Sequence, residues 1–216
     1  MIDLQAVNTI PDLMDAAADA YGSRSAVEDD KITLSYYQLN ELRLRAGVSL
    51  LAMGVEQGDR VAVWAPNIHE WIVAATALQT VGAVLVPLNT RMKGPEAGYI
   101  LRTSGAKLLF CMDQFLNCQY PAMLEGESLP GLEAIVIFRG QGSEYGISWD
   151  EFLQKSDNTP YQHIRLRQQQ VASDSLSDLL FTSGTTGKPK GVMTCHGQNL
   201  QVVEDWSRVV GLQAVS

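Results

Sequence analysis

Hydrophobic side chains recur at helical spacing through the first part of the chain, in two runs that each follow a capping residue. Thr9 is followed three residues later by Asp12, the pattern of an N-terminal capping box, and this first run stops at Gly22. Ser35 stands before the second run, and Gly54 closes it. We therefore predict two helices in this part of the chain.

Beyond Arg60 the pattern changes, and short apolar runs alternate with helical stretches. Strands are expected at 26–28, 32–34, 61–64, 83–86, 107–111, 134–138 and 179–181, and further helices at 70–81, 95–103, 115–124 and 149–153. Strands that alternate with helices indicate βαβ units, in which successive strands lie parallel. The predicted fold class is therefore α/β, with a mostly parallel sheet and flanking helices.

The pattern weakens between Arg139 and Ser175, where glycines, Pro160 and a run of glutamines indicate loops. We place a boundary in this stretch. The prediction is an N-terminal α/β subdomain at 1–155, a connector at 156–174, and the start of a second subdomain at 175–216.

One stretch, from Trp71 to Leu88, contains no charged residue and is long enough to raise the question of a membrane span. Its character changes at Gly82, from a helical pattern to a buried-strand pattern that ends at Pro87. An interrupted stretch of this kind is a poor spanning helix, so no membrane span is expected.

The composition narrows the class of function. The net charge of −8 disfavours a general nucleic-acid binder, because such a surface repels phosphate backbones. The three cysteines are odd in number and lack metal-site spacing, which is typical of reduced thiols in the cytoplasm. The N-terminus shows no basic region followed by an apolar stretch, so no signal peptide is expected.

The segment from Thr182 to Gly191 concentrates hydroxyl residues, glycines and two lysines between two apolar, strand-like pieces. Glycines let the backbone approach a ligand closely, and successive N–H groups in such turns converge into an anion-binding concavity. Hydroxyls donate further hydrogen bonds, and a lysine adds a compact positive charge. Together these features predict a loop that binds a polyphosphate.

This loop differs from the Walker-type phosphate loop. The position five residues before Gly187 is Thr182 rather than glycine, and Pro189 follows Lys188 where a magnesium-binding hydroxyl would stand. Proline also opposes immediate entry into a helix. The chemistry of GTPases and of P-loop kinases is therefore not implied.

The loop resembles the signature of the adenylate-forming superfamily, and in particular of its AMP-forming acyl-CoA synthetases. Weaker matches to the same family lie upstream in the right order, at 34–39, 58–62, 66–67 and 82–91. The resemblance covers essentially the whole chain. It implies the large N-terminal domain of such an enzyme, with its first subdomain followed by the start of the second.

The resemblance also implies a reaction. A carboxylate attacks the α-phosphorus of Mg-ATP to give an acyl-adenylate and pyrophosphate, and coenzyme A then takes the acyl group. By the same resemblance the loop wraps the β- and γ-phosphates, Lys190 neutralises the leaving pyrophosphate, and Thr182 helps to hold Mg²⁺; Lys188 is equally well explained as a solvated charge. The implied ligand-binding residues are Thr182, Ser183, Gly184, Thr185, Thr186, Gly187, Lys188 and Lys190.

No catalytic residue is assigned. His196 lies close to the loop, but no matching nucleophile can be named, and a role at the entry of a helix is the better interpretation. His69 and His163 are interpreted as surface or packing residues. The four tryptophans are interpreted as core or interface aromatics.

Members of the resembled family are much longer than 216 residues and need later segments for the acyl pocket, the ribose contact and a mobile lysine. We therefore expect a truncated product or fragment that is inactive alone, exposes apolar surface and forms homo-oligomers. The alternative is a noncatalytic nucleotide- or partner-binding module with the same early fold. The identity of the carboxylic acid substrate lies beyond this sequence.

Overall fold

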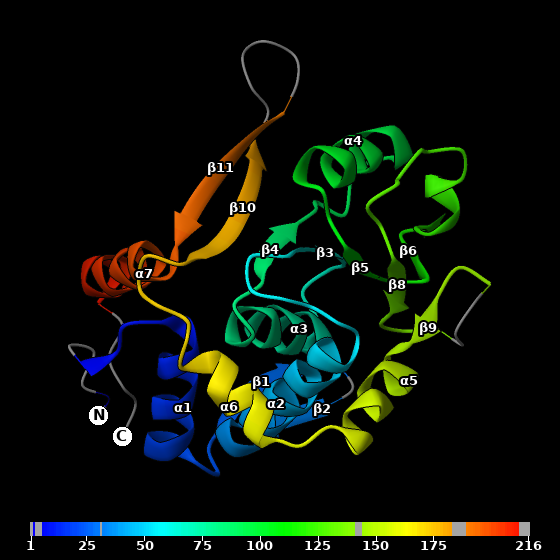
Figure 1. The fold of residues 1–216 in the computed structure, drawn as a ribbon. Coiled ribbons are helices and arrows are strands. Elements are labelled where there is room, and N and C mark those ends of the chain that lie inside the picture. Colours follow the sequence, from blue (N-terminus) through cyan, green and yellow to red (C-terminus); the bar gives the residue numbers. More distant parts are fainter. Residues whose placement is uncertain (1, 3–5, 31, 141–143, 183–188, 212–216) are drawn as a thin grey trace.

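A seven-stranded sheet with flanking helices organises the computed structural model, which describes residues 2, 6–30, 32–140, 144–182 and 189–211 (Figure 1). The sheet has the order β11-β10-β4-β3-β5-β8-β9. Its strands are β3 (Arg60–Trp64), β4 (Val84–Pro87), β5 (Leu108–Cys111), β8 (Ala134–Ile137), β9 (Ile147–Ser148), β10 (Leu176–Thr182) and β11 (Lys190–Cys195). All neighbours are parallel except β10 and β11, so the predicted α/β class is confirmed.

Helices and two small hairpins complete the described architecture. The helices are α1 (Ile10–Tyr21), α2 (Tyr36–Ala52), α3 (His69–Thr80), α4 (Gly94–Ser104), α5 (Trp149–Gln154), α6 (Gln162–Gln168) and α7 (His196–Val210), with short 3₁₀ turns η2 (Ala122–Leu124) and η3 (Lys155–Asn158). The hairpins are β1 (Ser25–Asp29) with β2 (Ile32–Ser35), and β6 (Gln114–Phe115) with β7 (Cys118–Gln119).

The predicted helix starts are confirmed. Thr9 and Asp12 form a reciprocal capping box at α1, and Ser35 forms one with Gln38 at α2. These side chains satisfy backbone N–H groups that have no partner within a helix, which fixes where each helix begins.

The central strands are buried on both faces, as their apolar runs predict. Every residue from Val61 to Trp64 is fully buried. The Trp64 ring stacks on Tyr120 at 4.4 Å between centroids, and its Nε1 donates to the Asn89 carbonyl oxygen at 3.0 Å. The stacking partner comes from a segment for which the sequence predicted a helix.

That predicted helix, 115–124, is wrong. The chain forms the β6–β7 hairpin there, with Leu116 and Asn117 at its turn, followed by η2. Both turn residues have φ in the left-handed region, at 50° and 60°, which a helix cannot accommodate. The apolar spacing that suggested a helix instead places Tyr120 against the core.

The sequence also missed α6 within the stretch interpreted as loops. This helix buries a single apolar residue, Ile164, so it carries almost no hydrophobic periodicity. Ile164 fits against Gly47 of α2, where an added Cβ would lie 2.3 Å from its Cδ1 atom. A long-range fit between one isoleucine and one glycine leaves no local pattern.

The uncharged stretch from Trp71 to Leu88 divides at Gly82, as predicted. Helix α3 precedes this glycine, whose φ is 74°, and β4 follows it. Within the described ranges, no helix combines the length and apolarity needed to cross a membrane. The proposed division at 156–174 remains a prediction; β10, which follows it, lies beside β4 in the same sheet.

Candidate functional site

The two described residues that bound the predicted phosphate-binding loop lie at the end of the β10–β11 hairpin, which extends away from the other strands of the sheet (Figure 1). Thr182 and Lys190 are paired across the hairpin, and both are exposed. The structure therefore brings together the first and last residues of the predicted site. The other predicted residues, Ser183, Gly184, Thr185, Thr186, Gly187 and Lys188, lie outside the described residues.

The sequence of the hairpin explains how its two strands pack. Gly191 pairs with Phe181, and an added Cβ at this glycine would lie 2.9 Å from Leu179 Cδ1. The missing side chain leaves room for Leu179 and Phe181, which pack against the hydrophobic core. Thus Gly191 serves the stem of the hairpin rather than the ligand directly.

A tyrosine that the sequence analysis did not single out reaches this hairpin from α4. The Tyr99 hydroxyl donates to the carbonyl oxygen of Pro189 at 3.4 Å. Pro189 directly precedes β11, so the contact links α4 to the residue at which the loop re-enters the sheet.

The root of the hairpin contains a buried carboxylate, Asp178, which the sequence analysis also missed. It accepts hydrogen bonds from Gln79 of α3, Ser177 of β10 and Asn199 of α7. Burial raises the pKa of Asp178, and these three neutral donors act in the opposite direction. A tertiary cluster of this kind has no local signature, because Gln79 and Asn199 are far from Asp178 in the sequence.

His196 occupies the first position of α7 and is fully buried, which confirms the predicted role at a helix entry. Its Nδ1 atom accepts a hydrogen bond from the Ile10 backbone N–H at 3.3 Å. Burial lowers the pKa of His196 to about 4, so the ring is neutral at neutral pH. The interaction ties α7 to the start of α1.

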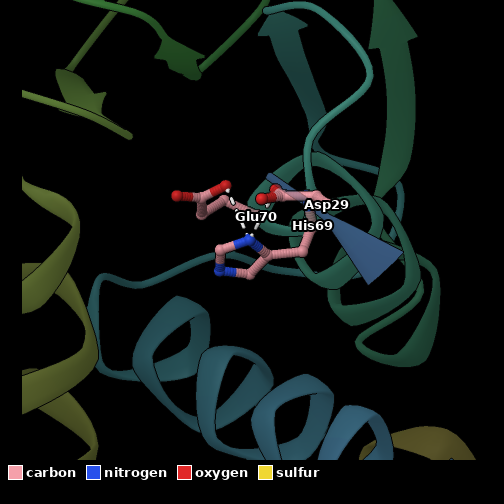
Figure 2. Close-up of side chains that lie close together, drawn as sticks. All are labelled: Asp29, His69 and Glu70. Carbon is pink, nitrogen blue, oxygen red and sulfur yellow. Dashed lines mark hydrogen bonds and ion pairs between the residues drawn. The ribbon is translucent and has the colours of Figure 1, made fainter. Parts of the chain in front are cut away.

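His69, interpreted from sequence as a surface or packing residue, lies instead in a polar cluster with Asp29 and Glu70 (Figure 2). One ligand atom from each of these three residues lies within 4.8 Å of the others, the geometry of a possible metal site. However, Arg139 contacts both carboxylates, with Nη2 at 2.6 Å from Asp29 Oδ2 and Nε at 2.8 Å from Glu70 Oε1.

The Arg139 guanidinium therefore already supplies positive charge where a metal ion would stand. The hydrogen bonds that Arg139 donates to Glu70 and Asp29 raise the pKa of Arg139, which keeps it charged throughout the physiological range. We interpret this cluster as a structural tie between β1, the start of α3 and the end of β8.

The remaining aromatic and histidine residues divide between core and surface. Trp64 is buried, and Trp149 packs edge-on against Phe110 and Phe138. Trp206 of α7, in contrast, is 57% exposed, and His163 is also exposed.

The mostly parallel sheet with its flanking helices defines the class as an α/β protein. Residues 14–214 match the family described as AMP-binding enzyme. The chain therefore belongs to the AMP-binding enzyme family, which confirms the resemblance seen in the sequence.

Curated relatives agree with this assignment. The chain is 36% identical over 203 residues to a 3-(7a-methyl-1,5-dioxo-octahydro-1H-inden-4-yl)propanoyl:CoA ligase of Mycobacterium tuberculosis, covering 93% of this chain and 39% of that protein. It is 32% identical over 206 residues to the putative acyl-CoA synthetase YngI of Bacillus subtilis, covering 88% and 38%, respectively. The chain thus spans about two fifths of the length of these relatives.

Solved structures show the same fold. The anthranilate CoA ligase AuaEII, in complex with anthranoyl-AMP, matches with a TM-score of 0.76 and 26% identity over 87% of this chain and 35% of that chain. A putative long-chain-fatty-acid CoA ligase from Rhodopseudomonas palustris matches with a TM-score of 0.80 over 96% of this chain and 49% of that chain. Its identity of 21% supports the fold alone.

Proposed function

We propose that the chain is the N-terminal portion of an AMP-forming acyl-CoA synthetase. In the reaction a carboxylate oxygen bonds to the α-phosphorus of ATP, and pyrophosphate leaves with the electron pair of the broken bond. The thiol of coenzyme A then loses its proton and bonds to the acyl carbon, and AMP leaves. The observation that carries this proposal is the match of residues 14–214 to the AMP-binding enzyme family, and the pairing of Thr182 with Lys190 at the ends of the predicted loop supports it.

Charge explains the proposed roles of these two residues. The leaving pyrophosphate carries several negative charges, so a lysine ammonium beside it lowers the barrier to its departure. Lys190 is exposed and stands at one side of the loop, free to approach such a group. The Thr182 hydroxyl is a hard oxygen donor at the other side, which suits Mg²⁺.

Several features favour this proposal over the noncatalytic alternative. The relatives are named CoA ligases, and AuaEII holds anthranoyl-AMP, an acyl-adenylate. The substrate is accordingly proposed to be a carboxylic acid, with ATP, Mg²⁺ and coenzyme A as the other reactants. Three free thiols, Cys111, Cys118 and Cys195, support the proposed cytoplasmic location.

Self-association of the chain stays a prediction. Large apolar side chains are exposed on α7 and on the outer part of the hairpin, which supports it. They are Leu180, Val192, Met193, Val202, Val203, Trp206, Val209 and Val210.

Replacing Lys190 with alanine is expected to weaken Mg-ATP binding about tenfold, because one charge-assisted contact to phosphate is lost. Isothermal titration calorimetry on the native chain and the variant measures this change. Lys155→Ala is the matched control, since Lys155 lies in η3, outside the hairpin, and should leave the affinity unchanged. Equal affinity of the native chain and Lys190→Ala would contradict the proposed role.

The 216-residue chain is also expected to show no carboxylate-dependent ATP–pyrophosphate exchange. An incomplete nucleotide site lacks some of the groups that would stabilise the charges of the transition state, even where it still binds ATP. Exchange of labelled pyrophosphate into ATP, measured with a panel of carboxylic acids, tests this expectation. A robust rate with any acid would show that this part of the protein is sufficient for adenylate formation.

A further inference from the structure

The direction of the β10–β11 hairpin depends on its root. The parallel register between β10 and β4 consists of one pair, Asp178 with Leu85. Beyond that pair, β10 is matched with β11 as far as Thr182 opposite Lys190. In the outer part of the stem Leu180 is 43% and Met193 65% exposed, whereas Leu179 and Phe181 pack against the core. Interactions at Asp178 therefore affect the position of the outer part of the hairpin, including Thr182 and Lys190.

The side chain of Asp178 joins three elements at this root. Its Oδ1 atom accepts from Gln79 Nε2 of α3 at 3.3 Å. Its Oδ2 atom lies 2.6 Å from the Ser177 hydroxyl and also accepts from the Asn199 amide of α7. The Asn199 amide nitrogen is also 2.9 Å from Ser177 Oγ, which closes the network.

A β-bulge makes this arrangement possible. The register between β10 and β11 shifts between Leu176 and Asp178, so Ser177 and Asp178 are both buried although they are consecutive. In a regular strand one of two consecutive side chains would face the opposite side of the sheet. At this bulge both polar side chains contact Asn199, and Asp178 also contacts Gln79.

We infer that Asp178 is a positioning residue for Thr182 and Lys190, the two described residues that bound the proposed phosphate-binding loop. Through Gln79 and Asn199 it fixes the stem of the hairpin to α3 and α7, and so it sets where Thr182 and Lys190 stand relative to the sheet. Asp178 makes no contact with the nucleotide in this role. The inference rests on the proposed function for its effect on ATP, but not for its effect on the hairpin itself.

The pairing of acceptor and donor provides a sharp test. Asp178→Asn places an amide NH₂ against the Asn199 or the Gln79 amide, whereas Asn199→Asp places a second carboxylate against Asp178. Each single substitution therefore breaks the network. The double substitution Asp178→Asn with Asn199→Asp exchanges donor and acceptor and restores complementary partners without changing the total charge.

Two measurements test the stability of the hairpin and the affinity for Mg-ATP separately. In amide hydrogen exchange, each single variant is expected to exchange about tenfold faster at 179–182 and 190–194, with α4 unchanged, and the double variant to recover. In calorimetry at a temperature where all variants are folded, each single variant is expected to bind Mg-ATP about tenfold more weakly, again with recovery in the double variant.

Asp15→Asn is the matched control, since it removes a carboxylate from a polar network among α1, α2 and α6. It is expected to lower the melting temperature while leaving the ATP affinity and the exchange of the hairpin unchanged. Native-like exchange at 179–182 and 190–194 in both single variants would overturn the inference. So would an equal loss of affinity in the Asp15→Asn control.

The design separates this inference from the proposed function. A native chain that fails to bind Mg-ATP would count against the proposed function, and hydrogen exchange would still decide whether Asp178 holds the hairpin. If the native chain binds Mg-ATP and the single variants bind it equally well, the result would contradict the positioning role of Asp178 and leave the proposed function intact.

Discussion

The Arg43→Met variant is expected to have a free energy of unfolding about 4 kcal/mol below that of the native chain. Arg43 is fully buried in α2, where Nη2 lies 2.6 Å from Asp15 Oδ1 and Nη1 lies 2.6 Å from Thr80 Oγ1. Its Nε atom also donates to Asn40 at 2.9 Å. Methionine would keep much of the volume but would leave these acceptors without their donor, which is the costly step in breaking a buried ion pair.

Burial lowers the pKa of Arg43 to about 10, and the charge of Asp15 opposes this shift. Arg43 is therefore charged at neutral pH, where the unfolding experiment is done. Urea denaturation followed by circular dichroism measures the change in free energy.

Arg165→Met provides the comparison for this prediction. Arg165 lies 2.7 Å from the other Asp15 oxygen, but its side chain is half exposed. Because water already solvates it, the loss is expected to be below about 1 kcal/mol. Similar losses for Arg43→Met and Arg165→Met would show that burial does not govern the strength of this network.

Acidification from pH 7 to pH 4 is expected to remove about 3 kcal/mol of stability through His196 alone. The pKa of its ring is about 4 in the folded chain, against an ordinary value of 6.5, and burial is the main cause. The unfolded chain therefore binds the proton more tightly than the folded chain does. The contribution is fully present above pH 6.5 and is lost as the pH falls from about 6.5 toward 4.

His196→Asn isolates this contribution from the titration of the carboxylates. The asparagine oxygen can replace His196 Nδ1 as the acceptor for the Ile10 N–H, and the side chain does not titrate. The difference in unfolding free energy between the native chain and the variant should shift in favour of the variant by about 3 kcal/mol between pH 7 and pH 4. A difference that is independent of pH over this range would contradict the assigned burial of the ring.

Predictions about the fold were correct where the sequence pattern depends on neighbouring residues, and they failed where the structure depends on contacts between distant residues. The helix caps at Thr9 and Ser35 and the apolar run at 61–64 act over a few neighbouring residues, and all three were predicted correctly. The helix predicted at 115–124 failed because Tyr120 is buried by stacking on a tryptophan far away in the sequence, Trp64, and not by lying on the buried face of a local helix. Helix α6 was missed because its buried contact is a single isoleucine on a glycine of α2.

The candidate site also combines features that local sequence predicts with features that depend on long-range contacts. The spacing of glycines, hydroxyls and lysines in the loop predicts phosphate binding from the sequence alone, and this stays a prediction. The structure adds the pairing of Thr182 with Lys190 and places Tyr99 against Pro189. It also reveals Asp178, whose partners stand 99 and 21 positions away along the chain.

Local chemistry in the chain was thus enough to specify the starts of the first helices, the buried strands and the α/β class, and to predict a phosphate loop. Folding was needed to choose which strands became neighbours, so that β10 lies beside β4 and its root meets α3 and α7. The reason is physical. Hydrophobic periodicity predicts that one face of an element is buried, but it does not determine which other element packs against that face. Partners are selected by the shape and hydrogen-bonding complementarity of surfaces that come together after the chain has collapsed.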